Sequence, residues 1–147
     1  MRLACIATSL ILLLPTATWA QTRWLPSSQD ARKAAEGITA AFAAGNFSGA
    51  MKEMSPLSVI PAPEFAAFEA QLNSQLDNIL RRMGNPTSYE FLREEQAGSR
   101  LIRFRFLVFH EKAPIQWNYI FYKSEKGWIM TDFNFSGSAP TFFAGGN

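Results

Sequence analysis

Three side chains in the second half of this chain could take part in acid–base chemistry. They are His110, Tyr119 and Asp132, and imidazole, phenol and carboxylate groups are common proton donors and acceptors in enzymes. His110 is the sole histidine of the sequence and Cys5 the sole cysteine. A Cys/His zinc site and a cysteine nucleophile are therefore excluded for the chain after residue 20.

The other catalytic patterns in the sequence are weak. Glu90, Glu94 and Glu95 lie near one predicted hairpin, but strand alternation puts Glu90 and Glu94 on one face and Glu95 on the other. Carboxylates on opposite faces cannot act as a glycosidase pair. The sequence contains neither a glycine-rich phosphate loop nor a calcium loop. We therefore expect no metal and no cofactor.

The first 20 residues, MRLACIATSLILLLPTATWA, have one early positive charge, an uncharged apolar run and a small-residue end. This layout predicts a secretory signal peptide cleaved after Ala20, with an apolar run too short to span a bilayer comfortably. We expect a secreted or periplasmic protein with no stable membrane insertion after cleavage. The 14 basic residues include Arg2, so 13 would remain against 12 acids. This near balance, together with export, argues against a nucleic-acid partner.

Helical periodicity dominates the first half of the remaining chain. After an irregular lead-in over residues 21–29, apolar residues recur at three- and four-residue spacing, and Ser28 or Asp30 is available as the first N-cap. Three helices are expected, over residues 30–45, 47–54 and 63–83.

After Pro86 the apolar period changes from 3.6 to 2, which predicts β-strands. The joints between them have hairpin length, so an antiparallel meander is expected. Helices followed by a meander predict one α+β domain over residues 30–136, with three helices on the concave face of a curved sheet of about four strands. Residues 137–147 are expected to be a flexible tail. The strands are expected over residues 88–95, 100–111, 115–123 and 127–136.

Strand alternation assigns each side chain of the last three strands to one face of the sheet. We expect the more apolar rows under the helices, which leaves Asp132 on the outer face with Arg103, Arg105 and Asn118. Asp132 would then pair with one of the two arginines across the strands. The expected inner rows are Ile102, Phe104, Phe106 and Val108; Ile115, Trp117, Tyr119 and Phe121; and Ile129, Thr131, Phe133 and Phe135.

The expected outer face also carries large apolar side chains among its arginines. A mixed surface of aromatic, aliphatic and arginine side chains is typical of a protein interface. Two interpretations remain open: a homodimer forms through this open sheet face, or the lead-in or the tail, with Phe142 and Phe143, folds back over it. The expected interface residues are Arg103, Arg105, Phe109, Ile120, Tyr122, Trp128 and Met130.

The element order resembles that of small exported bacterial members of the NTF2-like superfamily, a cone-shaped α+β fold. The resemblance covers residues 30–136 and is carried by the helical region around AFAAGNFSGAMKEMSP and by the final strand GWIMTDFNF. It implies a pocket between the helices and the concave sheet face, and often a dimer through the open face. The implied pocket residues are Phe68, Leu72, Phe104, Phe106, Trp117, Tyr119 and Phe133.

The sequence thus predicts an exported, non-catalytic domain that binds a small apolar molecule in the cone, acts as a dimeric interaction module, or does both. The alternative is a cofactor-free isomerase, dehydratase or cyclase that uses Tyr119, His110 or Asp132 in the cone. The isomerase-type site of the superfamily combines a carboxylate base with a tyrosine and a protonated acid. No residue of this chain matches that set position by position, so a non-enzymatic role is the main expectation.

Overall fold

The computed structural model describes residues 22–144. The predicted signal peptide, residues 1–20, lies outside the described residues. The elements follow in the order α1 (Ser28–Ala43), α2 (Phe47–Met54), a 3-10 turn (Ser55–Leu57), α3 (Ala62–Met83), β1 (Pro86–Ala97), β2 (Leu101–His110), β3 (Pro114–Ser124), β4 (Gly127–Ser136) and α4 (Ala139–Phe143).

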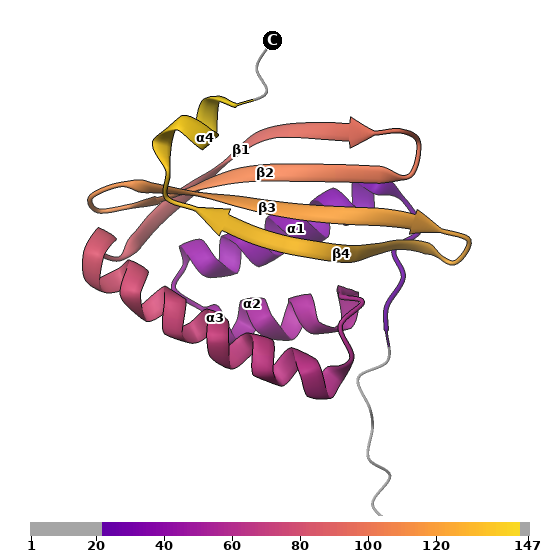
Figure 1. The fold of residues 1–147 in the computed structure, drawn as a ribbon, viewed down its shortest axis with the longest axis horizontal. Coiled ribbons are helices and arrows are strands. Elements are labelled where there is room, and N and C mark those ends of the chain that lie inside the picture. Colours follow the sequence, from indigo (N-terminus) through magenta and orange to yellow (C-terminus); the bar gives the residue numbers. More distant parts are fainter. Residues whose placement is uncertain (1–21, 145–147) are drawn as a thin grey trace, which may run out of the picture.

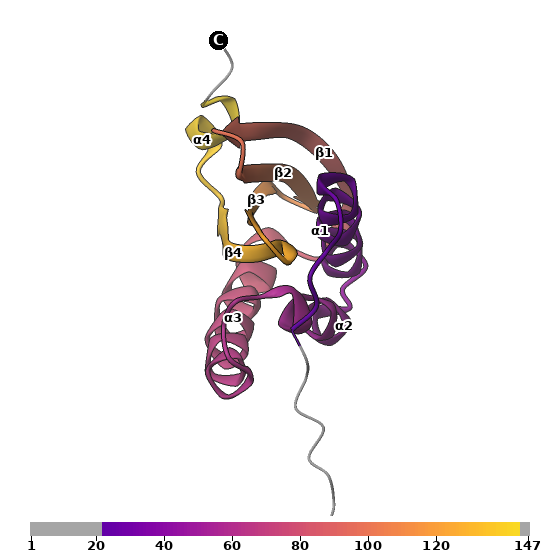
Figure 2. The same cartoon turned by 90° about the vertical axis from the view of Figure 1, so that its right-hand side faces the viewer.

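The four strands form one antiparallel sheet in the order β1-β2-β3-β4. The sheet curves over α1, which contacts all four strands, and α2 lies beside α1 (Figures 1 and 2). α3 lies below β4, and α4 lies on the opposite side of the sheet from α1 (Figure 2). This is the α+β arrangement that the NTF2-like resemblance implied, and the predicted fold class is confirmed.

Local signals set the helix ends close to their expected positions. The N-cap is Ser27, one residue before Ser28 and three before Asp30, and its side chain accepts a hydrogen bond from the backbone N–H of Asp30 at 3.1 Å. Gly45 has a φ of 73°, which ends α1, and Asn46 caps α2 by accepting from the N–H of Gly49 at 3.0 Å. None of the helices within residues 22–144 is long and apolar enough to cross a membrane.

The predicted inner rows of β2 and β3 form the centre of the core. All eight of these side chains are buried, since these strands pair without a register shift. The rows pack against α1 and α2, whose buried residues include Ile38, Phe42 and Met51. Alternation alone was therefore sufficient to orient the two central strands.

A β-bulge changes the prediction for β4. Ile120 pairs with Asp132 and Phe121 with Met130, so Thr131 is an extra residue in β4. Trp128 and Met130, predicted on the outer face, therefore lie on the inner face and are buried. Asp132 is exposed in the outer row, as predicted.

The same bulge moves two residues that we expected in the inner row of β4. Ile129 pairs with Tyr122 and so shares the outer row, whereas Thr131 is exposed at the bulge itself. Phe133 and Phe135, which follow the bulge, pair with Tyr119 and Trp117 and keep the inner positions that alternation gave them. The error is thus confined to the residues before Asp132.

The end of the described chain also differs from expectation. Ala139–Phe143 form α4, a short helix with Pro140 in its first turn, where the missing N–H of proline costs nothing. The backbone at the end of α4 contacts arginines on the outer sheet face. This part of the expected tail is therefore packed on the outer sheet face, as in the interpretation that the tail folds back, although its backbone makes these contacts and Phe143 stays exposed.

Candidate functional site

Most of the residues predicted to line a ligand pocket instead fill the cone. Phe104, Phe106, Trp117 and Tyr119 are at most 1% exposed. The ring of Trp117 lies 4.2 Å from that of Phe42, and the rings of Phe106 and Tyr119 are 5.8 Å apart, measured between centroids. These side chains belong to the hydrophobic core of the domain.

Tyr119, the expected hydroxyl of the pocket, is completely buried. Its hydroxyl oxygen lies 2.8 Å from that of Thr39, which in turn lies 2.8 Å from the carbonyl oxygen of Ala35. Burial raises the pKa of the Tyr119 phenol, and the hydrogen bond with Thr39 offsets only part of this rise. These hydrogen bonds satisfy the buried hydroxyl, and the raised pKa makes it a poor proton donor at neutral pH.

The remaining predicted pocket residues, Phe68, Leu72 and Phe133, lie where α3 meets β4. A hollow of about 220 Å³ is lined there by all three, and Phe68 and Phe133 also line a second hollow of about 80 Å³. Pockets that hold drug-sized molecules usually measure about 300–1,000 Å³. Each of these hollows is therefore smaller than a usual pocket for a drug-sized molecule.

The three candidate acid–base residues do not come together. Asp132 lines the smaller of the two α3–β4 hollows, whose lining includes neither Tyr119 nor His110. Its carboxylate accepts hydrogen bonds from the backbone N–H of Phe133 at 2.9 Å and from the side chain of Asn134 at 3.3 Å. His110 lies at the end of β2, with Nδ1 2.9 Å from the carbonyl oxygen of Gly84. This placement does not form the convergent acid–base site that the enzyme alternative requires.

His110 instead fastens the end of α3 to the sheet. Gly84, which caps α3, has a φ of 82°, and its carbonyl accepts from His110. We expect His110→Ala to lower the free energy of unfolding by about 1–2 kcal/mol, because a buried hydrogen bond is lost. Thermal unfolding and amide hydrogen exchange in the last turn of α3 would measure this loss. His110→Asn, which keeps a donor, should lose less, and an unchanged melting temperature in His110→Ala would contradict the anchoring role.

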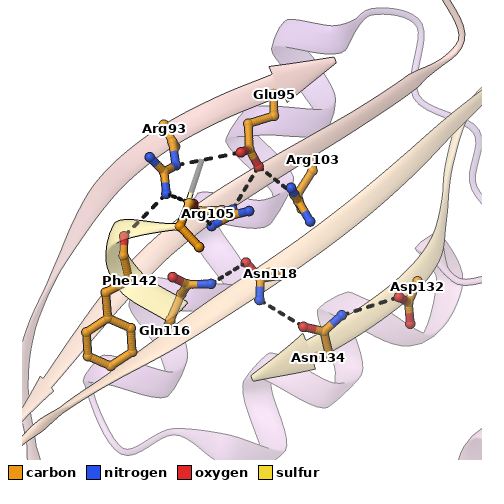
Figure 3. Close-up of polar contacts among 10 residues, drawn as sticks. Arg93, Glu95, Arg103, Arg105, Gln116, Asn118, Asp132, Asn134 and Phe142 are labelled. Atoms are coloured by element: carbon orange, nitrogen blue, oxygen red, sulfur yellow. Dashed lines mark hydrogen bonds and ion pairs between the residues drawn. The ribbon is translucent and has the colours of Figure 1, made fainter. Parts of the chain in front are cut away.

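A charged cluster occupies the middle of the outer sheet face (Figure 3). The carboxylate of Glu95 lies 2.5 Å from Nε of Arg103, 2.8 Å from Nε of Arg105 and 3.7 Å from Nε of Arg93. Only 8% of the Arg105 side chain is exposed, against 40% for Arg103. One carboxylate thus forms ion pairs with three guanidinium groups, and the side chain of Arg105 is nearly buried.

The pKa shifts in this cluster follow from burial and from the excess of positive charge. Burial raises the pKa of the Glu95 carboxyl, but the hydrogen bonds and charges of Arg103 and Arg105 outweigh it, so the pKa lies below its ordinary value. Burial lowers the pKa of Arg105, and the positive charge of Arg103 lowers it further, against the attraction of Glu95. The carboxylate is therefore favoured in its charged form.

Sequence reasoning missed Glu95 and Arg93 as members of this site. A bulge at Leu92, between the Phe91–Phe106 and Arg93–Arg105 pairs, turns both residues to the outer face. The prediction that Arg103 or Arg105 pairs with Asp132 is wrong, because both bind Glu95. Their outer-face position is confirmed.

Because of the same bulge, the three glutamates are distributed between the two sheet faces differently than predicted. Glu90 pairs with Leu107 and Glu95 with Arg103, both in outer rows, whereas Glu94 pairs with the inner residue Phe104. Glu90 and Glu95 thus share a face, and Glu94 does not. Since Glu95 is bound by arginines, the three acids still do not form a catalytic pair.

A ladder of side-chain amides continues from the cluster across β3 and β4 (Figure 3). Gln116 donates to Asn118 at 2.9 Å, Asn118 donates to Asn134 at 2.8 Å, and Asn134 donates to Asp132 at 3.3 Å. Asp132 is thus bound to an amide rather than to a cation. The ladder fixes the orientation of these four polar side chains on β3 and β4.

α4 rests on the arginine cluster. Nη2 of Arg93 donates to the carbonyl of Phe142 at 3.3 Å and also to that of Ala144, and Nη1 of Arg105 donates to the carbonyl of Ala144 at 3.0 Å. Cationic donors at the carbonyl end of a helix are electrostatically favourable. The cluster therefore anchors α4 while Arg103 remains accessible.

The rest of the outer face is largely apolar. Leu107, Phe109, Ile120 and Tyr122 are half-buried, and Leu101 is 40% exposed. Beside the β1–β2 turn lies an apolar depression of about 240 Å³, here termed the hairpin hollow. Its lining consists of Glu95, Gln96, Ala97, Leu101, Ile102, Arg103 and Ile120.

Within residues 22–144, no three His, Cys, Asp or Glu side chains gather in a way that could hold a metal ion. The groups that do gather are arginines around one glutamate, which repel cations. Of the seven predicted interface residues, Arg103, Arg105, Phe109, Ile120 and Tyr122 lie on the outer face. The outer face with its cluster and hollow is therefore the candidate functional surface.

No family model matches the sequence, and no curated protein matches it. A search of solved structures finds similarity to the crystal structure of a Campylobacter jejuni protein described as "Putative NTF2-like transpeptidase". The two chains are 15% identical, the alignment covers 69% of this chain and 97% of that chain, and the TM-score is 0.48. At this identity and TM-score the similarity does not bear on activity.

Proposed function

We propose that this chain is an exported, non-catalytic interaction domain that forms a homodimer through the outer face of its sheet. Export rests on the layout of the first 20 residues. The interaction role rests chiefly on one observation: large apolar side chains and arginines share a sheet face that α1, α2 and α3 leave uncovered. Such mixed surfaces are typical of protein interfaces.

The charges of this face suit a second copy of the same chain. Its rows contain three arginines, Arg93, Arg103 and Arg105, and three acids, Glu90, Glu95 and Asp132. Two such faces attract or repel each other little overall, so the apolar contacts decide the association. A strongly charged partner of one sign would gain less from this surface.

The two other predicted functions have less support. A small apolar ligand in the cone would have to displace core side chains such as Trp117 and Tyr119, which are almost fully buried. A cofactor-free enzyme would need convergent acid–base groups, and Tyr119, His110 and Asp132 each have separate structural partners. The geometry therefore favours a binding surface over a binding cavity.

Sedimentation of the exported protein tests the proposal. Material purified after export should begin at Gln21 and sediment as a dimer at about 10–100 µM, a range typical of moderate-affinity interfaces. Phe109→Glu, which places a charge on the outer face, should weaken the dimer at least roughly tenfold. Ala70→Glu on the exposed side of α3 is the matched control and should leave it unchanged. A monomer throughout this range would refute the proposal.

A further inference from the structure

Phe143 is the most exposed large apolar side chain within residues 22–144, with 80% of its surface accessible. It is the last residue of α4, whose end is held by Arg93 and Arg105 through the carbonyls of Phe142 and Ala144. An isolated exposed apolar side chain is ordinary in proteins. This one projects from an anchored helix on the face that we propose as an interface.

No side chain of residues 22–144 occupies the hairpin hollow on the same face. Its lining residues do not include Phe143. Ala97, Leu101 and Ile120 give it an apolar wall, and its volume of about 240 Å³ is below that of pockets for drug-sized molecules. A depression of this size and polarity fits a single large apolar side chain.

α4 and the hairpin hollow lie at two points along the same pair of strands, which allows a two-fold axis to bring α4 of one copy onto the hollow of the other. α4 is bound at the Arg93–Arg105 pair and the hollow lies near the Ala97–Leu101 pair, both on β1 and β2. The two points are four residues apart, or about 13 Å. Consider two copies whose outer sheet faces are opposed, related by a two-fold axis that is perpendicular to the strands and parallel to both sheets. In the second copy the strands run in the opposite direction, but β1 and β2 still lie opposite β1 and β2 of the first. When the axis crosses the strands midway between the two points, each α4 lies opposite the hollow of the other copy.

We propose that Phe143 of each copy inserts into the hairpin hollow of the other, so that the dimer has two identical aromatic contacts. This inference rests on the proposed dimer and names the residues that form it. Arg103, whose side chain is 40% exposed at the rim of the hollow, can pack its guanidinium against the inserted ring. α4 would serve as a spacer between the sheets, and the arginines that anchor it would position Phe143.

Sedimentation of three variants beside the wild type tests the contact. Phe143→Ser should raise the dimer dissociation constant at least tenfold, because both aromatic contacts are lost, and Phe143→Leu should raise it less. Val59→Ser removes the next most exposed large apolar side chain within residues 22–144, which is 49% accessible and next to the β4 edge, and should leave the dimer unchanged. Since Phe143 is exposed in the single chain, its replacement should leave the melting temperature unchanged at protein concentrations where the wild type is monomeric.

Cross-linking locates the contact directly. Benzoylphenylalanine at position 143, in a mixture of ¹⁴N- and ¹⁵N-labelled protein, should link to the other copy within residues 95–103 or at Ile120. The same probe at position 59 should give no such link. If wild type is dimeric but Phe143→Ser dimerises equally well, or the links fall elsewhere, this inference fails and the proposed dimer stands. If wild type is monomeric, both fail.

Discussion

Replacing Glu95 by glutamine should lower the free energy of unfolding by about 2 kcal/mol. Glutamine keeps the shape of the side chain but removes the negative charge that three arginines share. Arg105 would then remain almost buried beside Arg103 without a counter-charge. Loss of one partner of a fully buried ion pair costs about 3–5 kcal/mol, and the partial exposure of Glu95 and Arg103 reduces this figure. Urea unfolding at neutral pH would measure the difference.

Two control variants separate this effect from a general loss of surface charge. Glu94→Gln removes the neighbouring charge, which is exposed and makes no ion pair with these arginines, and should change stability by less than about 0.5 kcal/mol. Arg105→Met replaces the buried cation by an apolar chain of similar length and leaves Glu95 paired with Arg103, so it should cost less than Glu95→Gln. Equal stability of wild type and Glu95→Gln would show that the cluster contributes nothing to folding.

The same cluster should make stability depend on pH in the acid range. Burial raises the pKa of Glu95, but the arginines lower it by more, so its folded pKa lies below the ordinary value of a glutamate carboxyl, about 4.5. The unfolded state then binds more protons, and this contribution is fully present above about pH 4.5 and is lost as the pH falls through the folded pKa. The difference in the free energy of unfolding between wild type and Glu95→Gln should therefore become smaller at acid pH.

The sequence predicted the strands that pair without irregularity and erred where a bulge intervenes. In β2 and β3 the alternation is uninterrupted, and every inner residue was assigned correctly. In β4 three consecutive apolar residues, Trp128, Ile129 and Met130, precede the polar pair Thr131 and Asp132. Such breaks in alternation are the available signal of a bulge, but they do not reveal which residue is the extra one.

Prediction of the outer-face site was limited for the same reason. Arg103 and Arg105 were placed correctly, because β2 is regular. Their partner Glu95 was missed, because the bulge at Leu92 reverses the faces of the residues that follow it in β1. The helix α4 was missed because its anchors, Arg93 and Arg105, are far away in the sequence. A local propensity scan has no access to such contacts.

The cone interior shows a further limit of inference from alternation. The inner rows of β2 and β3 point toward the helices as predicted, but the direction of a side chain does not say whether space remains around it. Phe42 from α1 fills the space above Trp117, and Thr39 from the same helix meets Tyr119. The size of helix residues, rather than the strand pattern, decides between a pocket and a core.

Replacement of Trp117 by alanine should convert this core into a ligand-binding cavity. Trp117 is 1% exposed, and its ring lies 4.2 Å from that of Phe42, 5.4 Å from Phe133 and 5.3 Å from Phe135. Removal of such a side chain costs about 3–5 kcal/mol, since the surroundings relax only partly. An apolar cavity of about 150 Å³ stays dry and binds benzene. The variant should therefore melt well below wild type and be stabilised again by benzene or indole.

Whether the cone of the wild type is filled or holds a pocket can be decided by comparing the melting temperatures of wild type and Trp117→Ala with the same ligand. A ligand that binds only the folded state raises the melting temperature, so a filled cone predicts no rise for wild type and a clear rise for Trp117→Ala. Trp24→Ala is the matched control, because Trp24 is half-exposed in the lead-in and its loss opens no cavity in the core. If benzene or indole raised the melting temperature of wild type as much as that of Trp117→Ala, the cone would already hold a usable pocket. Apolar-ligand binding would then displace the outer face as the leading function.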